Sequence, residues 1–293
     1  MKHLAPLLAC LVLISCTHPP KHKKNDLETL HYKGRVKVVV YKIYHAMEDS
    51  GKVKKGGIIS KVITKCDSNG YFVQQSNYKG GEKLIYEVVH TYDKDHNLIS
   101  EMKTEDVMQY LSQDNSKPDS LNTVVDSFNY KLDEKGNKRV VKVKENGKPW
   151  YRDVNMFDDK GNVILSKEYV PWDTLNKTEK YKYDDKGNLV EKAAFRADSS
   201  LFIRYTYKYD DASNLVEVVT YNGMDSIRTK ETMKYDDKGN KTLDVSVKGD
   251  GTSQFDWHYE FTDFDKTGNW IRELTYSSGK PQSVVERLIE YYK

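Results

Sequence analysis

One eight-residue phrase recurs through the chain and constrains its fold more than any other feature. Its clearest copies read Tyr-Lys-Tyr-Asp-Asp-Lys-Gly-Asn at 181–188 and Met-Lys-Tyr-Asp-Asp-Lys-Gly-Asn at 233–240. The closing Asn falls at 97, 137, 162, 188, 214, 240 and 269, so four of the six intervals are 25 or 26 residues. A period of this length indicates a repeat architecture in which each copy is one supersecondary unit.

Within each copy, Asp-Asp-Lys-Gly-Asn has the chemistry of a tight hairpin turn. Asp opens a type I turn by accepting a hydrogen bond from the backbone ahead, and Gly then takes a positive φ without steric cost. Because these acids recur in every copy, whereas a reaction centre needs one, we predict that they are structural. The predicted turn residues are Asp184, Gly187, Asn188, Gly161, Asn162, Gly239, Asn240, Gly268 and Asn269.

The segments between the turns alternate apolar and polar residues. Phe255, Trp257 and Tyr259, for example, alternate with Asp256 and His258. A period of two predicts half-buried strands. We expect about eighteen of them from position 35 to the C-terminus. The last, around 283–292, also fits a capped helix, but the repeat register favours a strand.

The predicted fold class is therefore all-β, a repetitive antiparallel β-hairpin meander. Open twisted sheets of more than about ten strands curl, split or close. We expect this one to curl into a shell, with a barrel-like and a two-layer form both left open. Residues 31–293 are predicted to form one domain, interrupted by an insert at 104–120 that exceeds the repeat period.

Composition excludes several classes of protein. Lys plus Arg is 47 and Asp plus Glu is 44, and this near balance argues against a nucleic-acid partner. A charged fraction of 31% and a mean hydropathy of −0.78 exclude a multi-span helical membrane protein. The chain lacks the common nucleotide, zinc-protease and nucleophile motifs, and its histidines lack metal-ligand spacing. We therefore predict no catalytic residue, no metal and no cofactor.

The first sixteen residues resemble the export signal of bacterial lipoproteins. An apolar run too short to cross a bilayer ends in Leu13-Ile14-Ser15-Cys16, which is similar to a lipobox. The resemblance implies that residues 1–15 are a signal peptide and that Cys16 carries the lipid. Thr17, in place of Asp, implies by the same resemblance the outer membrane, with the face left open.

The segment after the signal has the composition of a linker. Residues 16–30 include Pro19-Pro20 and several Lys, so we predict a lipidated Cys followed by a flexible basic tether.

The repeated phrase itself resembles the YD repeat of Rhs-type proteins. In that family Tyr-Asp begins a turn and Gly-Asn followed by Leu leaves it, as in Tyr183-Asp-Asp-Lys-Gly-Asn-Leu189. The resemblance covers the larger part of the chain. It implies a β-hairpin shell or spiral at the cell surface and carries over no toxin role.

Two functional hypotheses follow. In the first, the protein is a membrane-anchored lipoprotein of the cell envelope, a non-catalytic β-repeat scaffold that binds a protein or glycan. Binding is assigned to the insert, with Tyr110, and to the loop Val170–Asn176, with Trp172 as an exposed aromatic. In the alternative, the curled sheet encloses a cavity of a lipid or glycan carrier, or of a glycan-active enzyme. An enclosed apolar groove would favour the carrier, and an acid pair outside the turns would favour the enzyme.

Overall fold

The computed structural model describes residues 25–94, 96, 98–106, 121–132, 138–143, 149–170 and 173–293. These residues form a short helix and eighteen strands, which confirms the predicted all-β class. Residues 283–291 lie in a strand, as predicted for the end of the chain. The elements are α1 (Asp26–Thr29), β1 (Val36–Asp49), β2 (Lys52–Cys66), β3 (Phe72–Lys79), β4 (Lys83–Tyr92), β5 (Leu98–Asp106), β6 (Leu121–Leu132), β7 (Lys138–Val143), β8 (Pro149–Phe157), β9 (Val163–Val170), β10 (Thr174–Tyr183), β11 (Leu189–Arg196), β12 (Leu201–Tyr209), β13 (Leu215–Asn222), β14 (Ile227–Tyr235), β15 (Lys241–Lys248), β16 (Ser253–Phe264), β17 (Trp270–Ser277) and β18 (Lys280–Tyr291).

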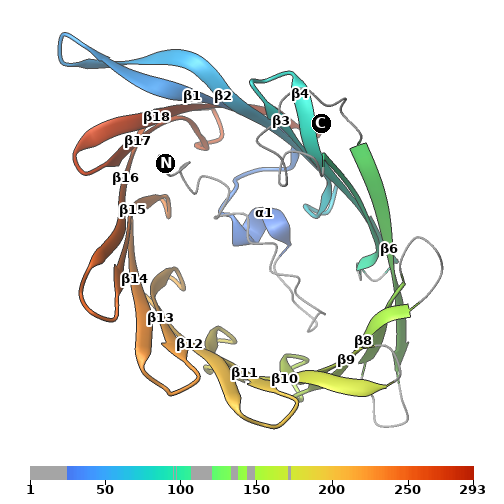
Figure 1. The fold of residues 1–293 in the computed structure, drawn as a ribbon. Helices are drawn as coiled ribbons and strands as arrows, with labels where there is room; N and C mark the ends of the chain where they lie inside the picture. Colours follow the sequence, from blue (N-terminus) through green and yellow to red (C-terminus); the bar gives the residue numbers. More distant parts are fainter. Residues whose placement is uncertain are drawn as a thin grey trace.

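The strands form one antiparallel sheet that curls into a ring. Each strand pairs with its neighbours in sequence, and β1 also pairs with β18 from Val36 with Tyr291 to His45 with Ser283. Every strand therefore has two partners, and the sheet closes around a central space (Figure 1). The barrel-like form is the one observed, and closure leaves few free strand edges.

Successive turns alternate between the two ends of the ring because the strands are antiparallel. One end, the repeat-turn rim, carries the connections that follow β2, β4, β6, β8, β10, β12, β14 and β16. The start of β1 and the end of β18 lie there too. The other end, the loop rim, carries the connections that follow the odd-numbered strands, including β5 to β6 and β9 to β10.

The regular repeat turns share one hydrogen-bonding pattern. At Asp184 to Asn188, the first Asp accepts the Asn188 backbone N–H at 2.8 Å and the Asn188 side-chain amide at 2.9 Å. The backbone closes the turn from Gly187 N to the Asp184 carbonyl at 3.0 Å, and Gly187 has φ +86°. The same bonds recur at 158–162, 210–214 and 236–240. Turn chemistry thus accounts for the first Asp and the closing Asn of these copies.

The tyrosine of each Tyr-Asp pair has a separate structural role. Tyr209 donates from its hydroxyl to the carbonyl of Leu189, at 3.0 Å, across one hairpin. Tyr183, Tyr235 and Tyr92 make the same bond to the carbonyl twenty residues earlier. Each of these tyrosines ties the end of the second strand of a hairpin to the start of the first strand of the same hairpin.

Two residues replace the turn glycine and adopt its conformation. Ser213 has φ +64° and His96 has φ +57°, where a Cβ carries strain. We expect Ser213→Gly to be neutral or slightly stabilising. Gly187→Val should cost more than about 1 kcal/mol because of its φ alone, since an added Cβ meets no atom within 4 Å. Urea melts of both variants test this, and a wild-type midpoint for Gly187→Val would contradict the turn assignment.

The predicted insert begins later than its sequence boundary. Thr104, Glu105 and Asp106 belong to β5 and pair with Thr123, Asn122 and Leu121 of β6. The surplus residues are therefore 107–120, which join two adjacent strands at the loop rim. The repeat period gives the number of surplus residues, but it does not give the position at which the pairing of β5 with β6 ends.

The two faces of the sheet follow from the ladder. Val39 and Cys66 pack on α1, which lies inside the ring (Figure 1). Directly paired residues share a face, so the pairs Val285–Glu273, Asp244–Trp257 and Tyr181–Lys192 belong to the same inner face. The inner face therefore mixes apolar, aromatic and charged side chains, in contrast to the uniformly apolar face that alternation favours.

Candidate functional site

The segment 25–35 enters the ring at the repeat-turn rim. Leu27 is 5% exposed and packs with Val36, Val39, Cys66 and Phe72. The prediction of a flexible tether over residues 16–30 is wrong for residues 25–30, because these residues are part of the folded domain. The sequence hid this because a single buried leucine, in so short a helix, leaves no periodic pattern.

Polar contacts fix the same segment against the first repeat turn. Asn25 caps α1 by accepting the Glu28 backbone N–H at 2.8 Å, and its side-chain amide donates to the Asn69 carbonyl at 2.7 Å. The Asp26 carboxylate accepts the Phe72 backbone N–H at 2.7 Å. Residue 25 is therefore held at the turn between β2 and β3.

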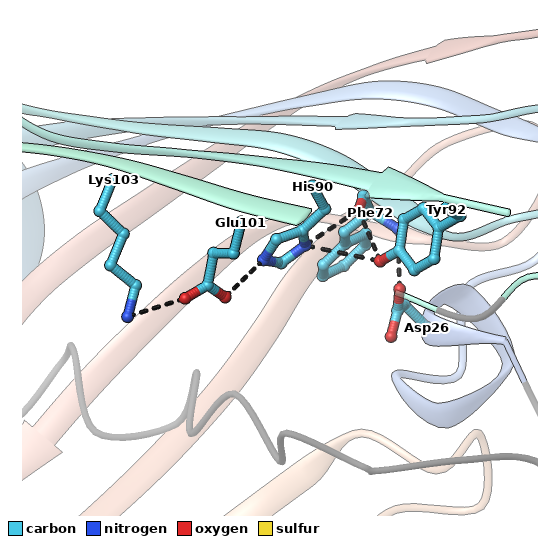
Figure 2. Close-up of polar contacts among 6 residues, drawn as sticks. All are labelled: Asp26, Phe72, His90, Tyr92, Glu101 and Lys103. Carbon is cyan, nitrogen blue, oxygen red and sulfur yellow. Dashed lines mark hydrogen bonds and ion pairs between the residues drawn. The ribbon is translucent and has the colours of Figure 1, made fainter. Parts of the chain in front are cut away.

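A chain of polar side chains runs along the inner face beside α1 (Figure 2). Lys103 donates to Glu101 at 2.9 Å, and Glu101 accepts from His90 Nε2 at 3.0 Å. On its other side, His90 Nδ1 lies 3.2 Å from the Phe72 carbonyl, which also accepts the Tyr92 hydroxyl at 2.9 Å. The Glu101 carboxylate only accepts, so Nε2 of His90 is the donor in their hydrogen bond.

This series of hydrogen-bonded side chains determines the charge of Glu101. Burial would raise the pKa of that carboxyl, but the hydrogen bonds from His90 and Lys103 outweigh it and lower the pKa to about 2. Burial, and to a smaller extent the nearby carboxylates, raises the pKa of Tyr92 well above its usual range. The chain is thus a satisfied, charged network whose glutamate stays ionised.

A second group of acids lies on the inner face of β14 and β15. Glu231 pairs with Ser246, and Asp244 pairs with Met233, so both carboxyls share that face. Asp244 is 4% exposed and accepts Lys241 at 2.5 Å. Burial and the adjacent Asp244 carboxylate raise the pKa of Glu231. An acid pair outside the repeat turns, one member of which has a raised pKa, is the feature that favours the enzyme hypothesis.

Glu273 of β17 is a further buried acid of this inner face, 9% exposed. It accepts the Thr275 hydroxyl at 3.0 Å. Burial raises the pKa of Glu273 to about 7, although Thr275, Arg287 and Lys241 act against the shift. Its carboxyl is therefore half-protonated near neutral pH.

A small polar hollow lies where the N-terminal segment meets the rim. The Arg287 guanidinium stacks on Trp270, 3.4 Å from the ring centroid, and donates to its carbonyl at 2.7 Å. At this turn Asn269 has left the regular pattern, because its amide donates to the Lys33 carbonyl and to the Tyr291 hydroxyl, each at 2.8 Å. The hollow is lined by Leu30, His31, Tyr32, Lys33, Lys238, Asn240, Gly268, Asn269, Trp270 and Arg287.

The residues predicted for anchoring and binding lie outside the described part of the chain. These are Cys16, Tyr110 and Trp172. The strand ends that flank the last two are described, and Asp106, Leu121, Val170 and Thr174 all lie at the loop rim. The two connections that carry the predicted binding residues therefore leave the ring at the same end.

The described residues offer no candidate for two further kinds of site. No group of three or more His, Cys, Asp or Glu residues is placed to hold a metal ion within the described ranges. No described helix is long and apolar enough to cross a membrane.

Sequence reasoning missed the inner-face groups for an identifiable reason. Glu101, Glu273 and His90 occur in strands whose alternation marks two faces but not which face is enclosed. A signal did exist for the tyrosines, because Tyr precedes Asp at 92, 183, 209 and 235. The recurrence of Tyr at that position indicates a specific hydroxyl bond beyond strand propensity.

Comparison with known proteins gives only distant structural matches. No protein family and no curated protein matches the chain. A porin-like protein from Bacteroides uniformis is 10% identical over 88% of this chain and 99% of its own, with a TM-score of 0.47. A porin-like protein from Bacteroides vulgatus is 15% identical over 86% of this chain and 97% of its own, with a TM-score of 0.30. The TcdB2-TccC3 structure is 10% identical over 82% of this chain and 16% of its own, with a TM-score of 0.32. These scores transfer no function.

Proposed function

We propose that the protein is a lipid-anchored scaffold of the bacterial cell envelope. It binds a protein or glycan partner at the loop rim, and it performs no catalysis. The observation that carries this proposal is the contrast between the rims. Four turns of the repeat-turn rim share one bonded pattern, whereas the connection from β5 to β6, which exceeds the repeat period, and the connection from β9 to β10 both leave from the loop rim. Repeat scaffolds place binding in such irregular loops, which vary without disturbing the paired strands.

Charged side chains on the outer face of the ring support the proposal that this face meets water while a lipid anchor holds the protein near a membrane. Glu217 bridges Lys208 and Lys230, each at 2.7 Å, and Lys182 pairs with Glu191 at 2.8 Å. These residues lie on the face opposite Tyr181 and Lys192. Charged side chains on a lipid-facing strand are costly at the bilayer centre, so this wall suits water.

Membrane fractionation and partner capture test the two parts of the proposal. We expect Cys16→Ser to abolish fatty-acid labelling and to release the chain from the membrane fraction. Capture from intact cells should weaken in Trp172→Ala and in a deletion of residues 108–119, which leaves the β5–β6 ladder in place.

A matched control uses Leu288, a large apolar residue of β18 that is 63% exposed and lies near the repeat-turn rim. Leu288→Ala should capture partners like the wild type. A Cys16→Ser variant that is still labelled and bound would overturn the anchor. A variant lacking both loop features that still captures its partner at full strength would overturn the binding assignment.

One observation favours a second candidate function, a glycan-active enzyme. Glu231 and Asp244 form an acid pair on the inner face, outside the repeat turns, with the pKa of Glu231 raised by burial and by Asp244. One protonated and one ionised carboxyl are the groups that glycoside hydrolysis uses. Release of sugars from envelope glycans that is lost in both Glu231→Gln and Asp244→Asn, with urea midpoints unchanged, would establish this function over the scaffold.

A further inference from the structure

We propose that the polar hollow at the repeat-turn rim binds a phosphate group, either as free phosphate or as the monoester end of a larger molecule. The hollow lies at the opposite end of the ring from the loop rim, because the turns after β14 and β16 line it. The proposed site therefore requires neither the lipid anchor nor the partner at the loop rim.

Two lysines from different parts of the chain meet at the turn between β16 and β17. The Lys33 side chain comes from the segment after α1 and lies over Gly268 of this turn, where an added Cβ would meet Lys33 Nζ at 3.4 Å. Lys238 comes from the turn between β14 and β15, and its Nζ lies 3.7 Å from the centroid of the Phe264 ring, where the β16–β17 turn begins. Both ammonium groups therefore lie at the same turn.

Arg287 of β18 supplies the third positive charge, in a fixed orientation. Its guanidinium stacks on Trp270, where the same turn ends, at 3.4 Å from the ring centroid. Its Nε–H donates to the Trp270 carbonyl at 2.7 Å, and the Tyr32 hydroxyl accepts a further hydrogen bond from the guanidinium. A guanidinium carries five N–H donors in one planar fork. Because its plane is already fixed, binding an oxyanion to the donors that remain costs little further ordering.

No acid of the hollow balances these charges. None of the described residues that line it is Asp or Glu. Among the residues that the structure describes, no carboxylate forms an ion pair with Lys33, Lys238 or Arg287. The outer wall differs, because Glu217 there bridges two lysines at 2.7 Å each. The hollow thus gathers positive charge that a bound anion would balance.

Turn bonds occupy the carboxylates of the two adjoining turns. Asp236 accepts the Lys238 backbone N–H at 2.9 Å, and it accepts both the backbone N–H and the side-chain amide of Asn240 at 2.8 Å. Asp265 accepts two backbone N–H groups of its own turn, at 2.9 and 3.0 Å, and the Tyr291 hydroxyl. These oxygens therefore serve the turns and not the three cations.

Glu273, inside the wall, balances only part of the charge of Arg287. The two groups interact through space, but burial raises the pKa of Glu273 to about 7. Its carboxyl is therefore about half ionised at neutral pH. Arg287 keeps part of its charge for a ligand.

The arrangement fits phosphate better than a carboxylate. A phosphate monoester carries about 1.5 to 2 negative charges at pH 7 and presents three strong acceptor oxygens. The hollow offers three cationic donors from three separate elements, and one of them is an arginine, whose fork matches two oxygens of a phosphate. A carboxylate has two oxygens and a single charge, so it would leave part of this donor set unused.

Titration calorimetry of the full chain in a phosphate-free buffer of low salt tests the site. We expect saturable binding of inorganic phosphate and of glycerol 1-phosphate. Lys238→Gln should weaken it about fivefold, because one charge-assisted contact is lost. The double variant Lys33→Gln, Lys238→Gln should abolish it, whereas Lys238→Arg should keep it.

Lys186→Gln is the matched control, because Lys186 holds the position of Lys238 in the turn between β10 and β11 and lies outside the hollow. It should bind phosphate like the wild type. Lys33, Lys238 and Lys186 are all exposed, so urea midpoints should not change in these variants. Absence of saturable binding of both probes to the wild type, or an equal loss of affinity in Lys186→Gln, would overturn the site.

Vesicles distinguish the two sources of the phosphate group. Phosphatidylcholine vesicles with and without phosphatidic acid, which carries a phosphate monoester, are sedimented with the protein. Binding that requires phosphatidic acid and is lost in the double variant would identify a lipid headgroup. Binding of the soluble probes alone would identify a free phosphate compound, and either result supports the site.

Discussion

Replacing Glu273 by glutamine is expected to stabilise the protein above neutral pH by roughly 3 kcal/mol. The folded state raises the pKa of Glu273 to about 7 from an ordinary value of 4.5, because the carboxyl is buried. A shift of that size corresponds to roughly 3 kcal/mol of preference for the neutral form. The wild type binds this proton more tightly when folded, so stability from Glu273 is present below about pH 4.5 and is lost as pH rises through 7.

Urea unfolding at pH 5.5 and pH 8 measures this effect. The midpoint of Glu273→Gln should fall less than that of the wild type between the two pH values, because glutamine has no proton to lose. Glu290→Gln, a change at an exposed position of β18, serves as the control and should keep the wild-type slope. An unchanged pH slope in Glu273→Gln would contradict the burial of an ionisable carboxyl there.

Replacing Glu101 by glutamine is expected to have the opposite sign, with a loss of roughly 3 kcal/mol at pH 7. Hydrogen bonds from His90 and Lys103 outweigh burial and hold the pKa of Glu101 near 2, below its ordinary 4.5. The ionised carboxylate therefore stabilises the fold fully above about pH 4.5, and that contribution disappears as pH falls through 2. Glutamine keeps one carbonyl acceptor but removes the negative charge that faces His90 and Lys103.

Thermal or urea melts from pH 7 down to pH 3 follow this second effect. The difference in unfolding free energy between the wild type and Glu101→Gln should become smaller as the pH falls. Glu82→Gln, at an exposed position between β3 and β4, should match the wild type throughout. A gap that stays constant with pH would mean that lost packing, and not the charge of Glu101, causes the change.

The repeat explains why the strands and their turns could be predicted. Asp184, Gly187 and Asn188 recur at a fixed period, and local turn chemistry alone sets their geometry. Local alternation then fixes the strands between them. These features depend on residues within a few positions of one another, so the sequence displays them directly.

Features that depend on distant residues could not be predicted in the same way. The pairing of β1 with β18 joins the two ends of the described domain, and no local pattern specifies such a partner. The same holds for Leu27 in its pocket and for Lys33, whose carbonyl accepts Asn269. The ion pairs of the inner face were hidden because a charged residue in a strand normally indicates the exposed side.

Ring closure has a consequence for how the protein is made. Tyr292 donates its backbone N–H to the Arg35 carbonyl at 2.8 Å, so the closing contacts need the end of the domain as well as its beginning. Contacts of such high contact order form slowly, and during synthesis the start of the domain emerges long before its end. Until β18 is available, the outer edge of β1 offers unpaired backbone groups to any passing strand. The final step of folding is therefore post-translational, and it removes an aggregation hazard as it completes the wall.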